Sequence, residues 1–386
     1  MNVEQLAPVE WPPMSRSEEM SLRAGCVAQC RGCAHRLMSA EQSEEQKTEW
    51  LQSRLNPWAE TFQSLRAVEG EARWHYRDRV VLAAEWSEVQ GWRFGMVVRD
   101  ELLPLQECPI HSERVARMLA LLREILPSGG RSFPLAYYAQ SGGQATLIVK
   151  MAEPPATKWL TEEAKVRLAE TGIEGLWLHA FPSAGRRLFS KHGWRLLWGS
   201  EHSYDPQGLR YGPTAFQQLI PALYIAAQDQ AQQFLAPDAG SSVVDLYCGN
   251  GATLRRWCEA GAETIGVELG GDALACAREN ASGAELLRGT CETRLPQLRQ
   301  WLGRVAPERT CLLYTNPPRT GMEEAVCRWV ADELMPTRIA YLSCSAGTLR
   351  RDLDRLFEAG YRVVAITPYD FFPQTYHVET LVLLER

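Results

Sequence analysis

Hydrophobic and polar positions follow two different patterns along the chain, and the change between them divides it into two structured regions. Between residues 73 and 198, short apolar, β-branched runs bounded by turn residues predict strands, among them 80–84, 93–98 and 145–149. Helical spacing near 110–126 and 161–171 interrupts these strands. This region is therefore predicted to be a mixed α+β domain.

After residue 213 the pattern becomes a regular alternation of strands and helices. A helix is expected over 215–235, and strands are expected over 242–246, 264–268, 310–315, 338–343, 361–367 and 380–384. Strands that alternate with helices predict an α/β fold with a doubly wound, mainly parallel sheet. The predicted organisation is an N-terminal segment with a tail, a cysteine loop and a helix (1–60), a central α+β domain (61–210) and a Rossmann-like C-terminal domain (211–386).

Composition narrows the class of protein. A chain of 386 residues exceeds what one hydrophobic core usually fills, so more than one domain is expected. Without a basic, apolar leader or a run long enough to cross a membrane, a soluble, cytoplasmic and monomeric protein is expected. Eleven cysteines, an odd number, favour free thiols, a metal site or catalysis over a disulfide framework.

The local distribution of charge along the chain is more informative than the net charge. The net charge of −6 argues weakly against a nucleic-acid partner. Between Glu174 and Glu201, however, no acidic residue occurs, and basic side chains alternate with aromatic ones: Arg186, Arg187, Phe189, Lys191, Trp194, Arg195 and Trp198. This mixture suits phosphate contact with base stacking, and an ordinary solvated face is an equally good interpretation.

A glycine turn follows the strand predicted at 242–246. The run Asp245-Leu-Tyr-Cys-Gly-Asn-Gly251 joins a strand to a helix start, where backbone can approach a ligand closely. Glu268 ends the next strand, and a carboxylate there can accept hydrogen bonds from both ribose hydroxyls of a cofactor. With only Gly249 and Gly251, the turn departs from the dinucleotide pattern G-x-G-x-x-G and favours S-adenosylmethionine over NAD.

Three further strand ends carry polar or reactive side chains. Asn316 precedes two prolines, and its amide can pair with a pyrimidine edge, unless this is only a turn that ends the strand. Cys344 lies just before a helix whose N-terminus favours thiolate. Glu379 has apolar neighbours that would raise its pKa toward the range for proton abstraction, and the nearby His377 is expected to orient or pack rather than act as the base.

Together these residues resemble the RNA (uracil-5-)methyltransferase family. The runs DLYCGNG (245–251), NPPRTG (316–321), LSCS (342–345) and YHVE (376–379) are similar to the family forms DLYCG-x-G, DPPR-x-G, SCNP and HVE. In the front half, Cys26-x3-Cys30-x2-Cys33, YRDR (76–79) and CPIH (108–111) are also similar. The resemblance covers most of the chain from Cys26 onward.

The resemblance implies a class I, S-adenosylmethionine-dependent methyltransferase acting on C5 of a uridine in structured RNA, rRNA rather than tRNA. It implies that Cys344 is the nucleophile that adds to C6 and that Glu379 is the base. The implied cofactor contacts are Gln218, Tyr247, Gly249, Gly251, Glu268 and Asn316. The implied [4Fe-4S] ligands are Cys26, Cys30, Cys33 and Cys108, with zinc as an open alternative.

Departures from the family pattern, and two rival functions, qualify this hypothesis. Asn316 stands where the family has Asp, and Ile220 stands where it has Asn, which puts cofactor affinity and base choice in question. The first three cysteines have the spacing of radical S-adenosylmethionine enzymes, but Gly32 replaces the usual aromatic residue and no barrel is predicted. A noncatalytic RNA-binding protein is the other rival, and a mere scaffold would need neither Cys344 nor Glu379.

Overall fold

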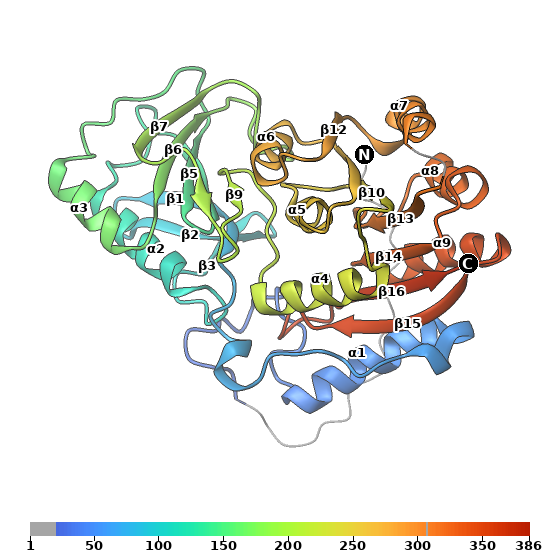
Figure 1. The fold of residues 1–386 in the computed structure, drawn as a ribbon. Helices are drawn as coiled ribbons and strands as arrows, with labels where there is room; N and C mark the ends of the chain where they lie inside the picture. The colour runs from blue at the N-terminus through green and yellow to red at the C-terminus, as the bar shows by residue number, and fades with distance from the viewer. Residues whose placement is uncertain (1–20, 306–307) are drawn as a thin grey trace.

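Two seven-stranded sheets form the main body of the protein (Figure 1). The computed structural model describes residues 21–305 and 308–386, so most of the polar tail expected at the N-terminus lies outside the described residues. In that described part, no helix is long and apolar enough to cross a membrane. The chain forms a mixed antiparallel sheet first and a mainly parallel sheet second, which confirms the predicted fold class.

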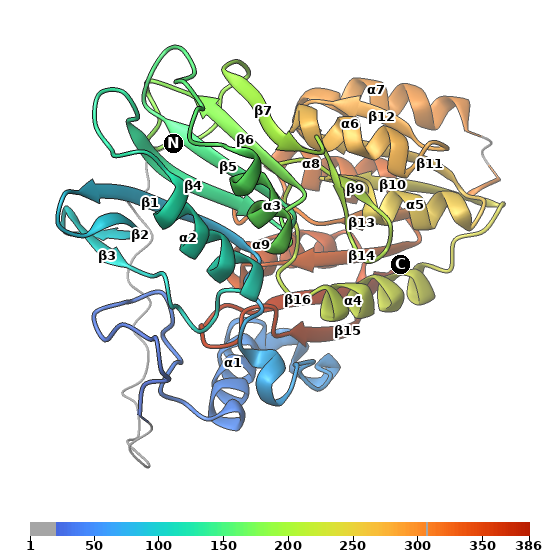
Figure 2. The same ribbon diagram turned by 90° about the vertical axis from the view of Figure 1, so that its left-hand side faces the viewer.

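The first sheet is mainly antiparallel, with strand order β3-β2-β1-β4-β5-β6-β7 and one parallel pair, β5 with β6. Helices α2 and α3 lie against one face (Figure 2), and α2 buries Val115, Met118 and Leu122 there. The elements are β1 (Arg79–Ser87), β2 (Gly91–Val98), β3 (Glu101–Pro104), α2 (Glu113–Ile125), β4 (Leu135–Ser141), β5 (Gln144–Val149), α3 (Glu162–Glu170), β6 (Gly175–Ala180) and β7 (Trp194–Gly199), followed by the small pair β8 (Ser203–Tyr204) and β9 (Arg210–Tyr211).

The second sheet has the order β12-β11-β10-β13-β14-β16-β15, in which the first five strands are parallel and β16 is antiparallel to both neighbours. Consecutive residues Val243 and Val244 belong to different core clusters because helices cover both faces. The elements are α4 (Pro221–Leu235), β10 (Ser241–Leu246), α5 (Ala252–Glu259), β11 (Glu263–Glu268), α6 (Gly271–Asn280), β12 (Glu285–Arg288), α7 (Cys291–Arg304), β13 (Thr310–Thr315), α8 (Glu324–Trp329), β14 (Arg338–Ser343), α9 (Ala346–Glu358), β15 (Arg362–Tyr369) and β16 (Glu379–Glu385).

Helix α4 begins six residues later than its apolar pattern predicts, at Pro221 instead of Ala215. Proline lacks an N–H and its ring clashes with the preceding turn, so Pro221 is tolerated only in the first turn of a helix. The residues before it take no regular structure and line the cavity described below. The sequence pattern also does not predict the short edge strand β12, because four residues carry little periodic signal.

The N-terminal segment packs on the second sheet. Helix α1 (Ala40–Arg54) begins at Ser39, whose side chain accepts a hydrogen bond from the Gln42 N–H, and it contacts α9. Farther along, Phe62 and Arg66 form bridges with Ile366 and Tyr369 of the edge strand β15. An edge strand with free backbone groups invites pairing with other chains, and this segment covers it.

A buried ion pair fastens α1 to the loop that joins β15 to β16. Lys47 Nζ lies 2.6 Å from Asp370 Oδ1, and both side chains are fully buried. Arg73 Nη1 is 3.5 Å from the other Asp370 oxygen and 2.7 Å from Glu44 Oε1. Lys47, Arg73 and Asp370 compensate one another's charge away from water, while Glu44 is partly exposed. Loss of a buried member therefore leaves an uncompensated buried charge.

We expect Lys47→Met to lower the free energy of unfolding by about 3 kcal/mol, because Asp370 then stays buried with only the more distant Arg73 as a partner. Denaturant unfolding followed by tryptophan fluorescence measures the change. Lys165→Met is the matched control, since Lys165 pairs with Glu162 at the surface and exposed pairs contribute about 1 kcal/mol or less. Equal stability of the two variants would contradict a role for the buried pair.

Candidate active site

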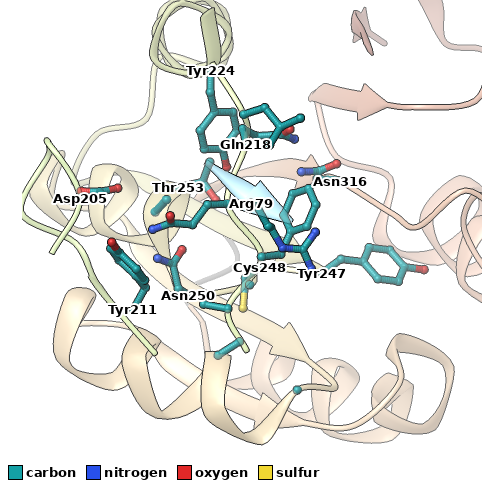
Figure 3. Close-up of a pocket in the computed structure, with 18 of the residues that line it drawn as sticks. Arg79, Asp205, Tyr211, Gln218, Tyr224, Tyr247, Cys248, Asn250, Thr253 and Asn316 are labelled. Atoms are coloured by element: carbon teal, nitrogen blue, oxygen red, sulfur yellow. The ribbon is translucent and has the colours of Figure 1, made fainter. Parts of the chain in front are cut away.

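A cavity of about 1400 Å³ lies at the junction of the two sheets and collects most of the predicted site residues. Its lining includes Gln218, Tyr247, Gly249, Glu268, Asn316, Cys344 and Glu379. Figure 3 shows Gln218 and Asn316 on one side of it and Asp205 and Tyr211 on the other. The cavity opens at the C-terminal ends of β10 and β13, where the strand order reverses and where open α/β sheets bind their ligands.

The glycine turn is shaped to bring its backbone up to a ligand. Tyr247, Gly249 and Gly251 all have positive φ angles, of 61°, 57° and 85°. A Cβ atom at Gly251 would lie 3.1 Å from the Cα of Ala277, so this position also needs glycine for packing between α5 and α6. Gly251 is the N-cap of α5 and is not part of the cavity lining itself.

Glu268 is held at the end of β11 by the turn that it faces. Its Oε2 accepts a hydrogen bond of 3.1 Å from the Gly249 N–H, and its Oε1 accepts one from the Gly270 N–H. These bonds fix the direction of the carboxylate, and each oxygen keeps a lone pair that faces the cavity side. The arrangement suits recognition of a ribose diol.

Asn316 and Gln218 supply amide groups to the same cavity. The Asn316 N–H donates to the Leu246 carbonyl at 3.3 Å, which holds the start of the Pro317-Pro318 turn against β10. Among the described residues none hydrogen-bonds the buried Oε1 of Gln218. Because buried acceptors are rarely left without partners, this oxygen marks a position where a ligand donor would fit.

Cys344 and Glu379 meet because β14 and β16 run antiparallel. Ser343 is paired with Thr380, so the next position of the register places Cys344 opposite Glu379. Glu379 is 3% exposed, and burial raises its pKa to about 8. Burial also raises the pKa of Cys344 to about 11, and the Glu379 carboxylate adds to this rise. The expected thiolate at the N-terminus of α9 is therefore not the resting form.

Arg319 is a charged residue beside Cys344 and Glu379 that the sequence analysis did not single out. Its guanidinium opposes the rise in pKa at both Cys344 and Glu379, and its Nη2 lies 3.3 Å from His377 Nε2. Burial, together with Arg319, lowers the pKa of His377 to about 4, so the imidazole is neutral. In the sequence, the position of Arg319 directly after the Pro-Pro turn was the only available signal for this residue, because its proximity to Cys344 arises from the fold.

The four cysteines implied as cluster ligands are neighbours, but they do not form a coordination shell. Burial raises the pKa of Cys33 to about 12, and Cys108, Cys30 and Cys26 each add to the rise. All four thiols are free. Within residues 21–305 and 308–386, no three cysteine, histidine or acidic side chains are arranged to hold a metal ion. The donor chemistry fits an iron–sulfur cluster, while the sulfur positions do not form its shell.

The basic and aromatic segment lies on β7 and on the loop before it. The rings of His179 and Trp194 are stacked at 4.1 Å, and Phe189 stacks on Trp194 at 5.5 Å. Arg186, Arg187, Lys191 and Arg195 are exposed. The segment is thus a surface with both stacking rings and cations. It lies at the β7 edge of the first sheet, opposite the β3 edge.

Comparisons with known proteins agree with this architecture. The family model described as tRNA (Uracil-5-)-methyltransferase matches residues 308–386. A Shewanella woodyi protein named 23S rRNA (uracil(1939)-C(5))-methyltransferase RlmD is 29% identical over 92% of this chain and 80% of its own length. A Bacillus cereus protein named uncharacterized RNA methyltransferase is 26% identical over 93% of this chain and 81% of its own.

A solved structure shares the fold over nearly the whole chain. The Pyrococcus abyssi tRNA (uracil-54, C5)-methyltransferase, in complex with S-adenosyl-L-homocysteine, superposes with a TM-score of 0.70 at 19% identity, covering 92% of this chain and 85% of that one. Both large sheets of the present chain are open, which leaves the described residues without the barrel of a radical enzyme. The matched C-terminal region and the relatives that span most of the chain place its similarity in the RNA (uracil-5-)methyltransferase family, and the solved structure shares its fold.

Proposed function

We propose that this protein is an S-adenosylmethionine-dependent RNA methyltransferase that modifies C5 of a uridine in structured RNA through a covalent adduct with Cys344. The observation that carries the proposal is the register that places Cys344 beside Glu379 in the cavity of the glycine turn. Relatives named for 23S rRNA support ribosomal RNA as the substrate class. The target nucleotide must leave its stack to enter the cavity.

The residues of the site supply the two groups that the chemistry needs. Uracil C5 is a weak nucleophile, so the Cys344 thiol gives its proton to solvent and its sulfur forms a bond to C6, which moves the C5–C6 electron pair onto the C5 enolate. S-adenosylmethionine, when bound, supplies an electrophilic methyl group. After C5 has taken this methyl, the Glu379 carboxylate removes the C5 proton, the double bond re-forms and the Cys344–C6 bond breaks.

Arg319 balances the charge of this sequence. Ionised Glu379 disfavours ionisation of Cys344, and Arg319 is the cation that opposes the rise in pKa at both groups. Its hydrogen bond to the neutral His377 orients the guanidinium beside them. We infer that Arg319 makes the ionised states accessible when the substrate covers the cavity.

The adduct is tested with S-adenosylmethionine and 5-fluorouridine-substituted ribosomal RNA fragments, because fluorine at C5 cannot be removed as a proton. A denaturing gel and peptide mass spectrometry should find RNA attached to Cys344. Cys344→Ala should form no adduct and lose methyl transfer by at least about three orders of magnitude, since the nucleophile is absent. Glu379→Gln should still attach to unsubstituted RNA but release it slowly.

Binding of S-adenosylhomocysteine, measured by calorimetry, is the control that both variants keep a folded site. A Cys344→Ala protein that transfers methyl groups at the wild-type rate would remove this residue from the mechanism. Absence of any adduct in the wild type, with the cofactor product still bound, would favour a noncatalytic RNA-binding role.

Release of methylated RNA from the Cys344 adduct, measured in a single turnover, should become faster as the pH rises through about 8, because Glu379 must be ionised to accept the C5 proton and burial raises its pKa to about 8. A rate that is constant or falls between pH 6 and 9 would contradict Glu379 as the base.

Thermal stability gives an independent test of the raised pKa of Glu379. Folding keeps Glu379 protonated from its usual pKa of 4.5 up to about 8, so the wild type loses stability across that window as pH rises. Glu379→Gln, which does not titrate, should gain in thermal midpoint relative to wild type over the same window.

We also propose that Cys26, Cys30, Cys33 and Cys108 hold a [4Fe-4S] cluster. Three of these thiols come from one loop and Cys108 from another. In addition to burial, Cys26 and Cys30 raise the pKa of both Cys33 and Cys108, a repulsion that metal binding would relieve. A bound cluster would tie these two loops together. No step of methyl transfer depends on it.

Cys108→Ser should bleach the visible absorbance of protein purified under anaerobic conditions, because the fourth thiolate is lost. Cys258→Ser is the matched control, since Cys258 lies on α5 away from the other thiols. Metal analysis distinguishes the two candidate metals: zinc without iron would replace the cluster by a zinc site, and unchanged absorbance in Cys108→Ser would exclude Cys108 as a ligand.

The basic and aromatic surface around β7 is the part of the central domain that we assign to RNA contact. Its exposed cations can neutralise phosphates, and its stacked rings offer faces to unpaired bases. Such contacts would hold a structured RNA while one nucleotide enters the cavity between the two sheets.

A further inference from the structure

Helix α1 lies outside the second sheet but touches the chain next to both reacting side chains. Leu51, fully buried on α1, forms a small cluster with Ala346 and Val378. Val378 directly precedes Glu379, and Ala346 is the first residue of α9, two positions after Cys344. A single leucine therefore packs against the two backbone segments that present the nucleophile and the base.

The strand ladder alone does not fix this pair. Cys344 lies one residue past the last paired position of β14, and Glu379 opens β16 directly after a loop. Tyr369, which pairs with Glu379 on the other side of β16, ends β15 just before the same loop. The separation of the two reacting atoms thus depends on what packs behind the ends of these strands.

A second set of contacts fixes the same loop, residues 370–378, from the same side. Lys47 lies one helical turn before Leu51, and its Nζ pairs with Asp370 and donates to the Phe372 carbonyl at 3.3 Å. The His35 N–H donates to the Gln374 carbonyl at 2.9 Å, and the Tyr76 hydroxyl donates to the Pro373 carbonyl at 3.2 Å. Positions along the loop are therefore held by the N-terminal half of the chain.

We propose that α1 is a positioning element for the reaction, with Leu51 as the positioning residue that sets the distance between Cys344 and Glu379, and with the Lys47–Asp370 pair holding the loop against it. The inference rests on the proposed function. Reacting groups must be held near their productive geometry, and a displacement of about 1 Å can cost about a hundredfold in rate. Packing sets this geometry because close-packed side chains transmit small changes in shape.

The alternative is that α1 only covers the edge of the sheet and adds stability. Substitution of two matched leucines distinguishes the positioning role from a purely stabilising role. Leu51 and Leu122 are both fully buried on helices, but Leu122 belongs to α2 beneath the first sheet and has no contact with the strand ends. Removal of either side chain leaves a comparable cavity, while only Leu51→Ala changes the support of the reacting pair.

The test measures kcat and KM for methyl transfer from radiolabelled S-adenosylmethionine to an unmodified 23S rRNA transcript, and calorimetric binding of S-adenosylhomocysteine. Leu51→Ala should lower kcat at least about tenfold, with KM and cofactor-product affinity within about twofold of wild type, because geometry and not binding is lost. Leu51→Met, which conserves volume, should restore kcat to within about threefold of wild type. Leu122→Ala should keep the wild-type kcat per folded molecule.

Alkylation of Cys344 by iodoacetamide, followed by peptide mass spectrometry without RNA, separates this inference from the proposed function. Leu51→Ala should change the alkylation rate at Cys344 at least about fivefold, and Leu122→Ala should not, since thiol reactivity follows burial and neighbouring charge. If wild type methylates no RNA, the proposed function fails and the alkylation result still decides the positioning role. Equal behaviour of Leu51→Ala and Leu122→Ala in both assays would overturn it. Should Leu51→Ala not fold, Leu51→Val tests the same contrast with a smaller cavity.

Discussion

The antiparallel pairing of β14 with β16 is the constraint on which the site depends. Parallel strands bring the glycine turn, Glu268 and Asn316 to one edge of the sheet, but they leave each strand end facing its own loop. The reversal of β16 brings Glu379 back along β14, so that residues 35 positions apart in the chain become neighbours across one register step. A thiol and a carboxylate thereby share one buried space.

That proximity has an electrostatic cost that shapes the resting site. Burial favours the neutral forms of both Cys344 and Glu379, and a charge on Glu379 would further oppose ionisation of Cys344. Arg319 is the compensating cation, and burial together with Arg319 keeps His377 neutral. The free protein therefore holds an uncharged pair beside the positive charge of Arg319.

The N-terminal segment and the second sheet form one mechanical unit, although Lys47 and Asp370, which join them, are 323 residues apart in the chain. Bridges to β15, the Lys47–Asp370 pair and the packing of Leu51 all converge on the end of the sheet that carries the reacting groups. The first sheet contributes the other wall of the cavity and the basic surface.

Local signals in the sequence determined the strands, the helices, the glycine turn and the residue types of the site, because period, turn chemistry and strand-end position are short-range properties. They also determined that Cys344 and Glu379 lie at strand ends. Only the tertiary structure decided that Arg319 faces both groups, that the Cys344 thiol is protonated and that α1 packs behind the pair. Those features follow from burial and from long-range contacts, which periodicity along the chain does not encode.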